Sequence, residues 1–246
     1  MATIVMVGAT SGIGSATARE FAQAGYDLVL AGRNMEKLSR LGADLGIRFG
    51  VRTEIISYDA LLPEAGTRLY EQIVERFDPD GLIIFHGALP DPAEVNRDAS
   101  AARECMEVNF LSVVELLVPF ANHFEERMRG WIAVVGSVAG DRGRQSNYAY
   151  GAAKGGLAVY LQGLRNRLAP RGVHVLTVKP GLVDTDMTSG MEGLARRIMA
   201  SPERVARDIY RAVRRRSNVV YTPFFWKYIM WIVRLIPESL FKNMKF

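Results

Sequence analysis

Three polar residues in the middle of the chain have the types and the spacing of a proton-transfer site. Ser137, Tyr150 and Lys154 form a Ser-x12-Tyr-x3-Lys pattern. A phenol has an unperturbed pKa of about 10 and is a poor acid or base near neutrality. A lysine four residues later on a helix lies one turn away, where its charge favours the phenolate and lowers the tyrosine pKa. A serine hydroxyl from a neighbouring strand end could then hold a carbonyl or alcohol oxygen beside that phenol.

A Tyr-x3-Lys pair also occurs on ordinary solvated helix faces, so other elements must position this one. The first is a glycine turn with G-x3-G-x-G spacing, between an apolar, β-branched run at 3–7 and a helical pattern. Gly8 permits a tight turn, Gly12 lets the backbone approach phosphates, and Gly14 lets the helix pack close to the sheet. A strand, a glycine turn and a helix start in this order predict a pyrophosphate cradle. Its predicted cofactor-binding residues are Gly8, Thr10, Ser11, Gly12, Ile13 and Gly14.

Compact apolar runs alternate with helical patterns along the whole chain. Such runs are typical of strands covered on both faces. The alternation predicts an α/β fold with a single-domain, Rossmann-type, doubly wound parallel sheet of about seven strands and helices on both faces. Ser201-Pro202-Glu203 is a helix start, with a capping hydroxyl, a first-turn proline and an acid at the positive end. The expected strands lie near 3–7, 27–31, 52–57, 81–85, 131–136, 173–178 and 218–221.

The composition is that of an ordinary globular protein. The 246 residues are 49% hydrophobic and 23% charged, with no repeat, low-complexity segment or linker. We therefore expect a catalytic domain at 1–222 and a distinctive tail at 223–246. Cys105 is the only cysteine, so an intrachain disulfide is excluded. The simplest interpretation of Cys105 is a buried apolar residue. No secretory signal is recognisable, so a cytoplasmic protein is expected, and no metal site is predicted.

The net charge of +5 is concentrated near the C-terminus. Nucleic-acid binding is one interpretation of such a cluster, but no nucleic-acid module or separate basic domain accompanies it. A solvated helix face, or one that faces acidic lipid, is favoured instead. The clustered arginines are Arg196, Arg197, Arg204, Arg207, Arg211, Arg214, Arg215 and Arg216.

The catalytic set and the glycine turn, in this order and separation, resemble the short-chain dehydrogenase/reductase family over residues 3–222. Further matches are Asp59 after the third strand, Asn109 in Val-Asn-Phe, and the run Pro-Gly-Leu-Val-Asp-Thr at 180–185. The chain departs from the family after the fourth strand. There the family usually has an Asn-Asn-Ala-Gly-like turn, whereas this chain has Phe-His-Gly-Ala at 85–88. We interpret His86 as structural or adenosine-side rather than catalytic.

The resemblance implies an oxidoreductase that interconverts a ketone and a secondary alcohol. Tyr150 would give a proton to the carbonyl oxygen as hydride arrives from the nicotinamide, and Ser137 would hydrogen-bond the same oxygen. Lys154 would lower the Tyr150 pKa and bind the nicotinamide ribose, and Asn109 would position a water that links Lys154 to solvent. Asp59 would accept from the adenine amino group. The remaining implied cofactor contacts are Gly87, Pro180, Gly181, Val183 and Thr185, the last on the nicotinamide carboxamide. A homodimer or homotetramer is also implied.

The end of the second strand bears on the choice of nicotinamide cofactor. An acid there would bind the ribose hydroxyls of NAD, but this chain presents Arg33 instead. A guanidinium suits the 2′-phosphate of NADP through bidentate, charge-assisted hydrogen bonds. NADP(H) is therefore favoured over NAD(H). The alternative is an arginine that lies over the adenine without selecting the phosphate.

The tail combines an apolar run with basic residues. The run of 13 residues at 224–236 contains two charges and is too short to span a bilayer. Lys227 and Arg234 are seven apart and share a helix face, which leaves an apolar stripe of Trp226, Ile229, Met230 and Val233. These features describe an interfacial helix on a membrane surface. Alternatively, the tail packs against the domain or a second subunit and lines the substrate pocket.

The stretches 146–154 and 228–237 also resemble one branch of the family, which contains the keto-reductase component of decaprenylphosphoryl-ribose 2′-epimerase. That resemblance implies a lipid-linked keto-sugar as substrate and a protein peripheral to the inner face of the membrane. Two alternatives stay open. One is a soluble substrate such as a 3-oxoacyl thioester, and the other is a non-catalytic nucleotide-binding scaffold or redox sensor.

Overall fold

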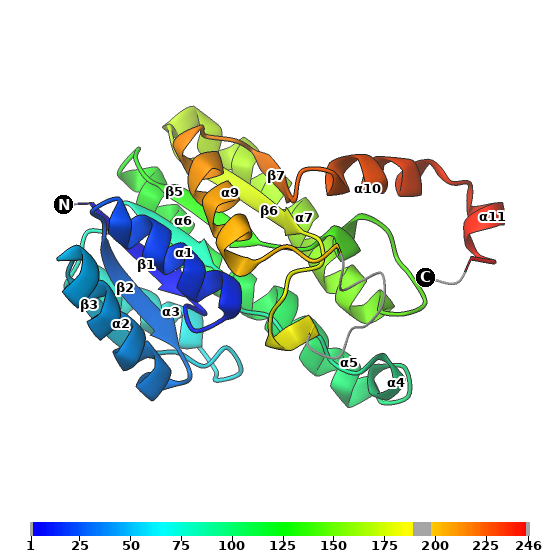
Figure 1. Ribbon diagram of the computed structural model, residues 1–246, viewed down its shortest axis with the longest axis horizontal. Coiled ribbons are helices and arrows are strands. Elements are labelled where there is room, and N and C mark those ends of the chain that lie inside the picture. Colours follow the sequence, from blue (N-terminus) through cyan, green and yellow to red (C-terminus); the bar gives the residue numbers. More distant parts are fainter. Residues whose placement is uncertain (1, 189–197, 245–246) are drawn as a thin grey trace.

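A seven-stranded, wholly parallel sheet forms the centre of the protein, and the computed structural model describes residues 2–188 and 198–244 (Figure 1). The strand order is β3-β2-β1-β4-β5-β6-β7, and every neighbouring pair is parallel. This confirms the predicted fold class, and each strand lies within two residues of its expected position. The strands are β1 Thr3–Val7, β2 Asp27–Gly32, β3 Thr53–Ser57, β4 Gly81–Ile84, β5 Trp131–Val135, β6 His174–Pro180 and β7 Val219–Thr222.

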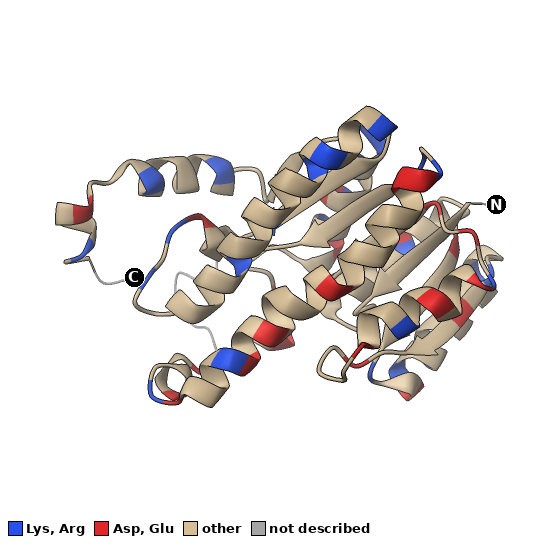
Figure 2. Ribbon diagram, turned by 180° about the vertical axis from the view of Figure 1, so that it is seen from behind, with Lys and Arg blue, Asp and Glu red and all other residues tan. Residues whose placement is uncertain are grey.

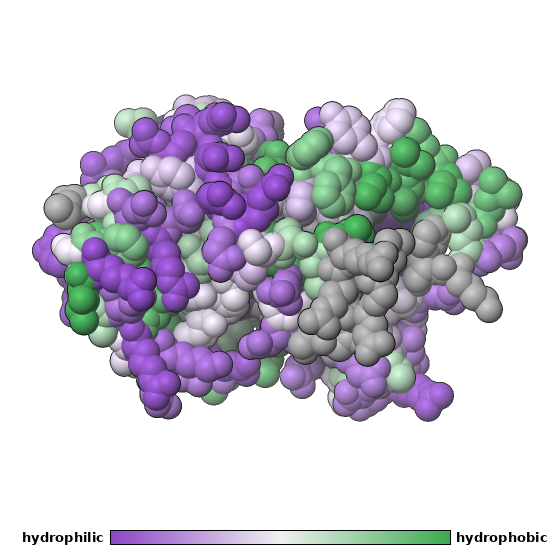
Figure 3. All heavy atoms as spheres, in the orientation of Figure 1, coloured by the Kyte–Doolittle hydropathy of each residue, from purple (hydrophilic) through white to green (hydrophobic). Residues whose placement is uncertain are grey.

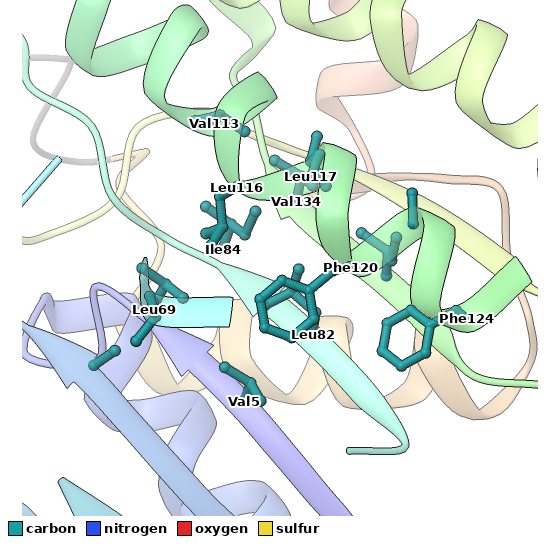
Figure 4. Close-up of a cluster of buried hydrophobic side chains, with 14 of the residues drawn as sticks. Val5, Leu69, Leu82, Ile84, Val113, Leu116, Leu117, Phe120, Phe124 and Val134 are labelled. Atoms are coloured by element: carbon teal, nitrogen blue, oxygen red, sulfur yellow. The ribbon is translucent and has the colours of Figure 1, made fainter. Parts of the chain in front are cut away.

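Helices cover both faces of the sheet because each strand presents apolar side chains on both sides. One core lies under α3, α6 and α7, where Phe120 and Phe124 of α6 pack toward Leu82 of β4 (Figure 4). A second core lies under α1, α2 and α9. The long helices are α1 Gly12–Gln23, α2 Met35–Phe49, α3 Ala65–Val74, α6 Ser112–Glu126, α7 Tyr148–Leu168 and α9 Pro202–Arg214. The shorter helical elements are α4 Pro92–Val95, α5 Ala99–Met106, η1 Glu107–Leu111, η2 Val138–Asp141, η3 Ala169–Arg171, η4 Asp186–Thr188, α10 Trp226–Leu235 and α11 Glu238–Phe241.

The order of the strands determines where a site can form. β1 lies between β2 and β4, so the chain winds outward in opposite directions from this point. The turns that follow parallel strands all lie at the carboxyl edge of the sheet, and ligands of such folds bind at this switch point. The turns after β1, β4, β5 and β6 are therefore brought together there.

Side-chain caps begin several helices, among them α9 and α2. Ser201 caps α9 and accepts a hydrogen bond from the Arg204 amide at 3.2 Å, which confirms the predicted helix start. Asn34 caps α2 and accepts from the Lys37 amide at 2.8 Å. The described arginines of the basic cluster are exposed on α9 or just beyond it, whereas Arg196 and Arg197 lie outside the described residues.

Arg142 fixes the tail to the domain. Its guanidinium donates to the carbonyl oxygens of Val233 at 2.8 Å and Ile236 at 2.6 Å, and to the Glu238 carboxylate at 2.9 Å. It also lies 3.8 Å from the centre of the Phe241 ring. A helix leaves its last carbonyl groups without partners, so one arginine here caps α10 and holds α11 as well.

Only one side of α10 contacts the rest of the protein. Met230 is 3% exposed, and Trp226 and Val233 are half-buried. Three of the four residues of the predicted apolar stripe are thus buried or half-buried, as the alternative of a packed tail expects, whereas Ile229 is 38% exposed. The contacts of α10 with the domain include η2, β7 and Gly181. Among the described residues, no helix has both the length and the apolar character to cross a membrane.

We expect Arg142→Ala to free the tail without unfolding the sheet. Amide hydrogen exchange in residues 226–241 should accelerate at least about tenfold, because hydrogen bonds from a charged group contribute roughly 1.5–3 kcal/mol. The exchange rate in Arg142→Lys should lie between those of the wild type and Arg142→Ala, since an ammonium group cannot make the several hydrogen bonds of the planar guanidinium. Arg167→Ala, which removes the Glu125 ion pair between α6 and α7, is the matched control. Unchanged protection of the tail in Arg142→Ala would contradict this role.

Candidate active site

The turn after β1 has the close packing that its glycines require. Gly8 has a φ of +81°, and a Cβ there would lie 2.7 Å from the His86 backbone nitrogen. A Cβ on Gly14 would lie 2.6 Å from the Gly8 carbonyl oxygen. Ser11 caps α1: its hydroxyl accepts from the Gly14 amide at 3.0 Å and donates to the Gly8 carbonyl at 2.9 Å. The turn therefore leads directly into an open helix N-terminus, which favours an anion.

Ser137, Tyr150 and Lys154 meet at the carboxyl end of β5. Ser137 follows the strand and caps η2, where its hydroxyl accepts from the Ala139 amide at 3.1 Å. Tyr150 and Lys154 lie one turn apart on α7, and Ser137 and Tyr150 line the same cavity. The Lys154 ammonium donates to the Val135 carbonyl oxygen at 3.4 Å. The predicted catalytic residues thus line one cavity, with a volume of about 400 Å³.

The electrostatics of this set differ from the simple expectation. Burial raises the pKa of Tyr150, and the Ser137 side chain only partly opposes that rise. Burial lowers the pKa of Lys154 to about 8. The Lys154 nitrogen lies 5.8 Å from the centre of the Tyr150 ring. The expectation of a lowered Tyr150 pKa is therefore wrong for this geometry, because the desolvation of the phenol outweighs the stabilisation of its charged form.

Asn109 holds the turn after β4 from behind the cavity. It lies in the π-helical turn η1, a distortion that is frequent at functional sites. Its side-chain oxygen accepts from the Ala88 amide at 3.1 Å, and its nitrogen donates to the carbonyls of Ala88 at 2.8 Å and Cys105 at 2.9 Å. A Cβ on Gly87 would lie 2.8 Å from the Asn109 oxygen and 3.1 Å from the Lys154 nitrogen. The water-positioning role of Asn109 stays a prediction.

His86 connects the same turn to α6. Its Nε2 lies 3.0 Å from the Ser112 hydroxyl, which itself donates to the Val108 carbonyl. The serine must therefore accept, so Nε2 of His86 carries the proton. Burial and the charge of Lys154 lower the pKa of His86 to about 3, which keeps the ring neutral. Its ring lies 5.6 Å from that of Tyr58, on the wall of a second cavity. This geometry supports the structural, adenosine-side interpretation.

The two cavities form one elongated cleft because they share lining residues. The second cavity has a volume of about 520 Å³ and extends along the end of β2. Of the predicted site residues, Gly14 and Asn109 stand behind the walls rather than in them. The predicted residues that line the cleft are Gly8, Thr10, Ser11, Gly12, Ile13, Arg33, Asp59, Gly87, Ser137, Tyr150, Lys154, Pro180, Gly181, Val183 and Thr185.

The structure adds residues that the sequence analysis missed. Lys37 in the first turn of α2 lines the cleft four residues after Arg33, and the N-cap Asn34 lines it as well. The sequence signal that could have identified Lys37 is a second basic residue four positions after Arg33. Met187 and Thr188 close the catalytic end. Trp226 of the tail packs directly on Gly181 and leaves no room there for a Cβ, a contact between distant segments that no local pattern indicates.

The residues of the cleft fit a dinucleotide. The α1 N-terminus suits a pyrophosphate, and Arg33 and Lys37 stand at the end of β2, where the sequence has no acid. Asp59 lies on the same wall, with its carboxylate accepting from the Leu61 amide at 3.1 Å. Ser137 and Tyr150 occupy the opposite end. In residues 2–188 and 198–244, no group of three or more His, Cys, Asp or Glu side chains could hold a metal ion.

Comparison with known proteins agrees with this geometry. Residues 2–193 match the model of the short chain dehydrogenase family. The chain belongs to this family. It is similar to an uncharacterized oxidoreductase of Mycobacterium tuberculosis, with 33% identity over 99% of this chain and 97% of the relative. An uncharacterized oxidoreductase of Streptomyces coelicolor is 30% identical over 98% of this chain and 95% of its own length.

Among solved structures, a short-chain dehydrogenase from Sphingobium yanoikuyae in complex with NADPH is similar in fold. Its TM-score is 0.85 at 25% identity, covering 97% of this chain and 98% of that one. The named relatives are oxidoreductases and the family is one of dehydrogenases. The protein is therefore an oxidoreductase of the short-chain dehydrogenase family.

Burial of the charged Lys154 side chain should lower the free energy of unfolding, and replacing Lys154 by an apolar residue should raise it. The folded pKa of about 8 lies below the ordinary 10.5, so the charged form is disfavoured by folding. At pH 7 the cost is on the order of 3 kcal/mol, since one pKa unit corresponds to about 1.4 kcal/mol. Lys154→Met should thus raise the free energy of unfolding below pH 8, and this advantage should fade between pH 8 and 10.5.

Urea unfolding of both proteins across pH 7 to 10.5 measures this difference. Lys179→Met is the matched control, because Lys179 pairs with the buried Asp141 carboxylate. That substitution should destabilise the protein, since it leaves a buried charge unpaired. A destabilised Lys154→Met, or a difference that does not depend on pH, would contradict the argument.

Proposed function

We propose that this oxidoreductase interconverts a ketone and a secondary alcohol with NADP(H) as cofactor. The observation that supports the proposal is that Ser137, Tyr150 and Lys154 line one end of the cleft that Arg33 and Lys37 also line. Two adjacent hydroxyls can hold one substrate oxygen from two directions. That arrangement suits the proton transfer that carbonyl reduction requires.

Each catalytic residue has a distinct proposed role. Ser137 hydrogen-bonds the substrate oxygen and orients it toward Tyr150. Tyr150 donates its proton to that oxygen in reduction and takes it back in oxidation. Lys154 stabilises the resulting phenolate and binds the nicotinamide ribose, and Asn109 positions a water beside Lys154. When bound, the nicotinamide supplies or accepts the hydride.

The raised pKa of Tyr150 is consistent with this direction of proton flow. A buried phenol above its ordinary pKa is held in the neutral, proton-donating form at neutral pH. The residue is thus poised as an acid rather than as a standing phenolate. A positive charge beside it would then favour the phenolate once the proton has left.

The preference for NADP(H) rests on two cations and on one related structure. Arg33 and Lys37 can both reach a 2′-phosphate at the end of β2, and a guanidinium binds phosphate in a bidentate manner. The related Sphingobium yanoikuyae enzyme was solved with NADPH. Asp59 is proposed to accept from the adenine amino group, and Thr185 to contact the nicotinamide carboxamide.

The proposed substrate is a large apolar or lipid-linked carbonyl compound, and a lipid-linked keto-sugar is the favoured example. Its support is the contact of Trp226 with Gly181, which puts the tail at 223–246 beside the substrate end of the cleft of the 1–222 catalytic domain. A soluble substrate such as a 3-oxoacyl thioester is the runner-up. A non-catalytic scaffold or redox sensor is disfavoured by the complete catalytic set.

A homodimer or homotetramer is proposed for the assembly, in the cytoplasm or peripheral to the inner face of the membrane. Support for self-association comes from α6 and α7, which pack on the same face of the sheet and expose Val118 and Val159. Exposed apolar side chains on two helices that cover one face of the sheet suit a packed helical interface.

Tyr150→Phe should abolish hydride transfer and leave cofactor binding largely intact. The loss in turnover should be at least about 10³-fold, because the phenylalanine ring has no proton to donate. NADPH affinity, measured by fluorescence titration, should change less than about threefold, since only the hydroxyl group is removed and the ring stays. Tyr148→Phe, at an exposed position two residues earlier, is the matched control. Retained turnover in Tyr150→Phe would refute the catalytic assignment.

Substrates for this assay come from a screen of keto-sugar, 3-oxoacyl and steroid-like carbonyl compounds, with NADPH consumption as the readout. Turnover of one class by the wild type and not by Tyr150→Phe identifies the substrate class. If NADPH binds but no compound turns over, the scaffold interpretation gains support.

Arg33→Ala combined with Lys37→Ala should reverse the cofactor preference. The KM for NADPH should rise at least about 30-fold, because each charged hydrogen bond contributes roughly 1.5–3 kcal/mol. The KM for NADH should change little, since NADH carries no 2′-phosphate. Arg40→Ala, on the same helix and paired with Glu36, provides the control. Equal effects on both cofactors would support the alternative in which Arg33 only covers the adenine.

A further inference from the structure

The outer face of α10 and the turn before it expose a continuous set of large apolar side chains. Their exposed fractions lie between 58% and 66%. These side chains gather into one band over α10 (Figure 3). Contiguous exposed apolar surface marks an interaction site. We call this band the α10 surface: Phe224, Tyr228, Trp231, Ile232 and Leu235.

Basic residues flank the α10 surface. Lys227 and Arg234 are exposed, and α10 contains no acidic residue (Figure 2). Both cations line a groove of about 410 Å³ together with Tyr221, Tyr228 and Trp231. Aromatic rings with a polar end and long basic side chains are the residues that prefer the boundary between lipid head groups and acyl chains.

The orientation of this surface is fixed. Met230 is buried on the opposite side of the helix, and Trp226 packs on Gly181. Arg142 caps the end of α10 through the carbonyls of Val233 and Ile236. The α10 surface is therefore presented outward as a preformed helix, and no ordering cost remains for binding.

The charge pattern decides between two occupants. In a twofold dimer the same patch meets itself, so Lys227 and Arg234 would face the same cations with no acid on α10 to compensate. An anionic bilayer offers both an apolar layer and a negative surface. We propose that the α10 surface docks on an anionic lipid bilayer, with Trp231 and Ile232 inserted among the acyl chains and Lys227 and Arg234 at the head groups.

The docking goes beyond the proposed reaction and stands without it. Since Gly181 lines the substrate end of the cleft and contacts Trp226, a docked protein would hold that end near the lipid. A carbonyl compound dissolved in the membrane could then enter without crossing water. Catalysis on a soluble ketone needs no such contact, so binding and turnover can be tested separately.

Vesicle flotation of the full-length protein tests the proposal. We expect flotation with vesicles of phosphatidylcholine and phosphatidylglycerol, and much less with phosphatidylcholine alone. Trp231→Ser with Ile232→Ser should weaken binding at least about tenfold, because two large apolar groups no longer enter the lipid. Lys227→Gln and Arg234→Gln should each weaken anionic binding about fivefold and leave neutral binding unchanged.

Ile47→Ser and Arg40→Gln, at exposed positions on α2, are the matched controls and should float like the wild type. Circular dichroism and NADPH binding of each variant verify its fold, and a misfolded double variant is replaced by Phe224→Ser. No flotation of the folded wild type, or flotation that the substitutions leave unchanged, would overturn the proposal. The proposal would also be overturned if the wild type bound no lipid and formed a dimer in analytical ultracentrifugation that dissociates in the Trp231 and Ile232 double variant.

Discussion

The site depends on a buried ammonium group that the fold must accommodate without a carboxylate. Among the described residues Lys154 has no ion-pair partner, and burial lowers its pKa to about 8. The Val135 carbonyl accepts its hydrogen bond, and Gly87 leaves it space that a Cβ would fill. Asn109 in turn holds the backbone beside Gly87. The π-helical turn η1, Gly87 and the end of β5 thus together keep a positive charge beside a phenol in a low-dielectric cleft.

A second polar network links the catalytic turn to the tail. The Asp141 carboxylate ends the turn that Ser137 begins, and it binds Lys179 of β6 and the Tyr221 hydroxyl of β7. The next residue, Arg142, holds the end of α10. The loop that carries Ser137 is therefore fixed on one side to the sheet and on the other to the tail.

Much of the fold and of the site could be predicted from the sequence because the signals are local. Strand runs, helix caps such as Ser201 and the glycine turn at Gly8 each depend on a few neighbouring residues. Local patterns reach their limit where distant segments meet. Which side of α10 packs on the domain follows from its contacts with Gly181, η2 and β7, and no local pattern indicates these contacts. The Tyr150 pKa was expected to fall, because spacing reveals a nearby lysine but not the depth of burial.

The sequence by itself determined the family, the parallel α/β architecture and the residues proposed for catalysis, since all three follow from residue types at fixed separations. Only the tertiary structure decided which groups share a cleft and which surfaces stay uncovered. It assigned the His86 proton through Ser112, added Lys37 to the cofactor wall and put Trp226 on Gly181. The physical reason is that burial and long-range contacts depend on how segments far apart in the chain pack together, and this packing decides which groups lose contact with water and which charges come close.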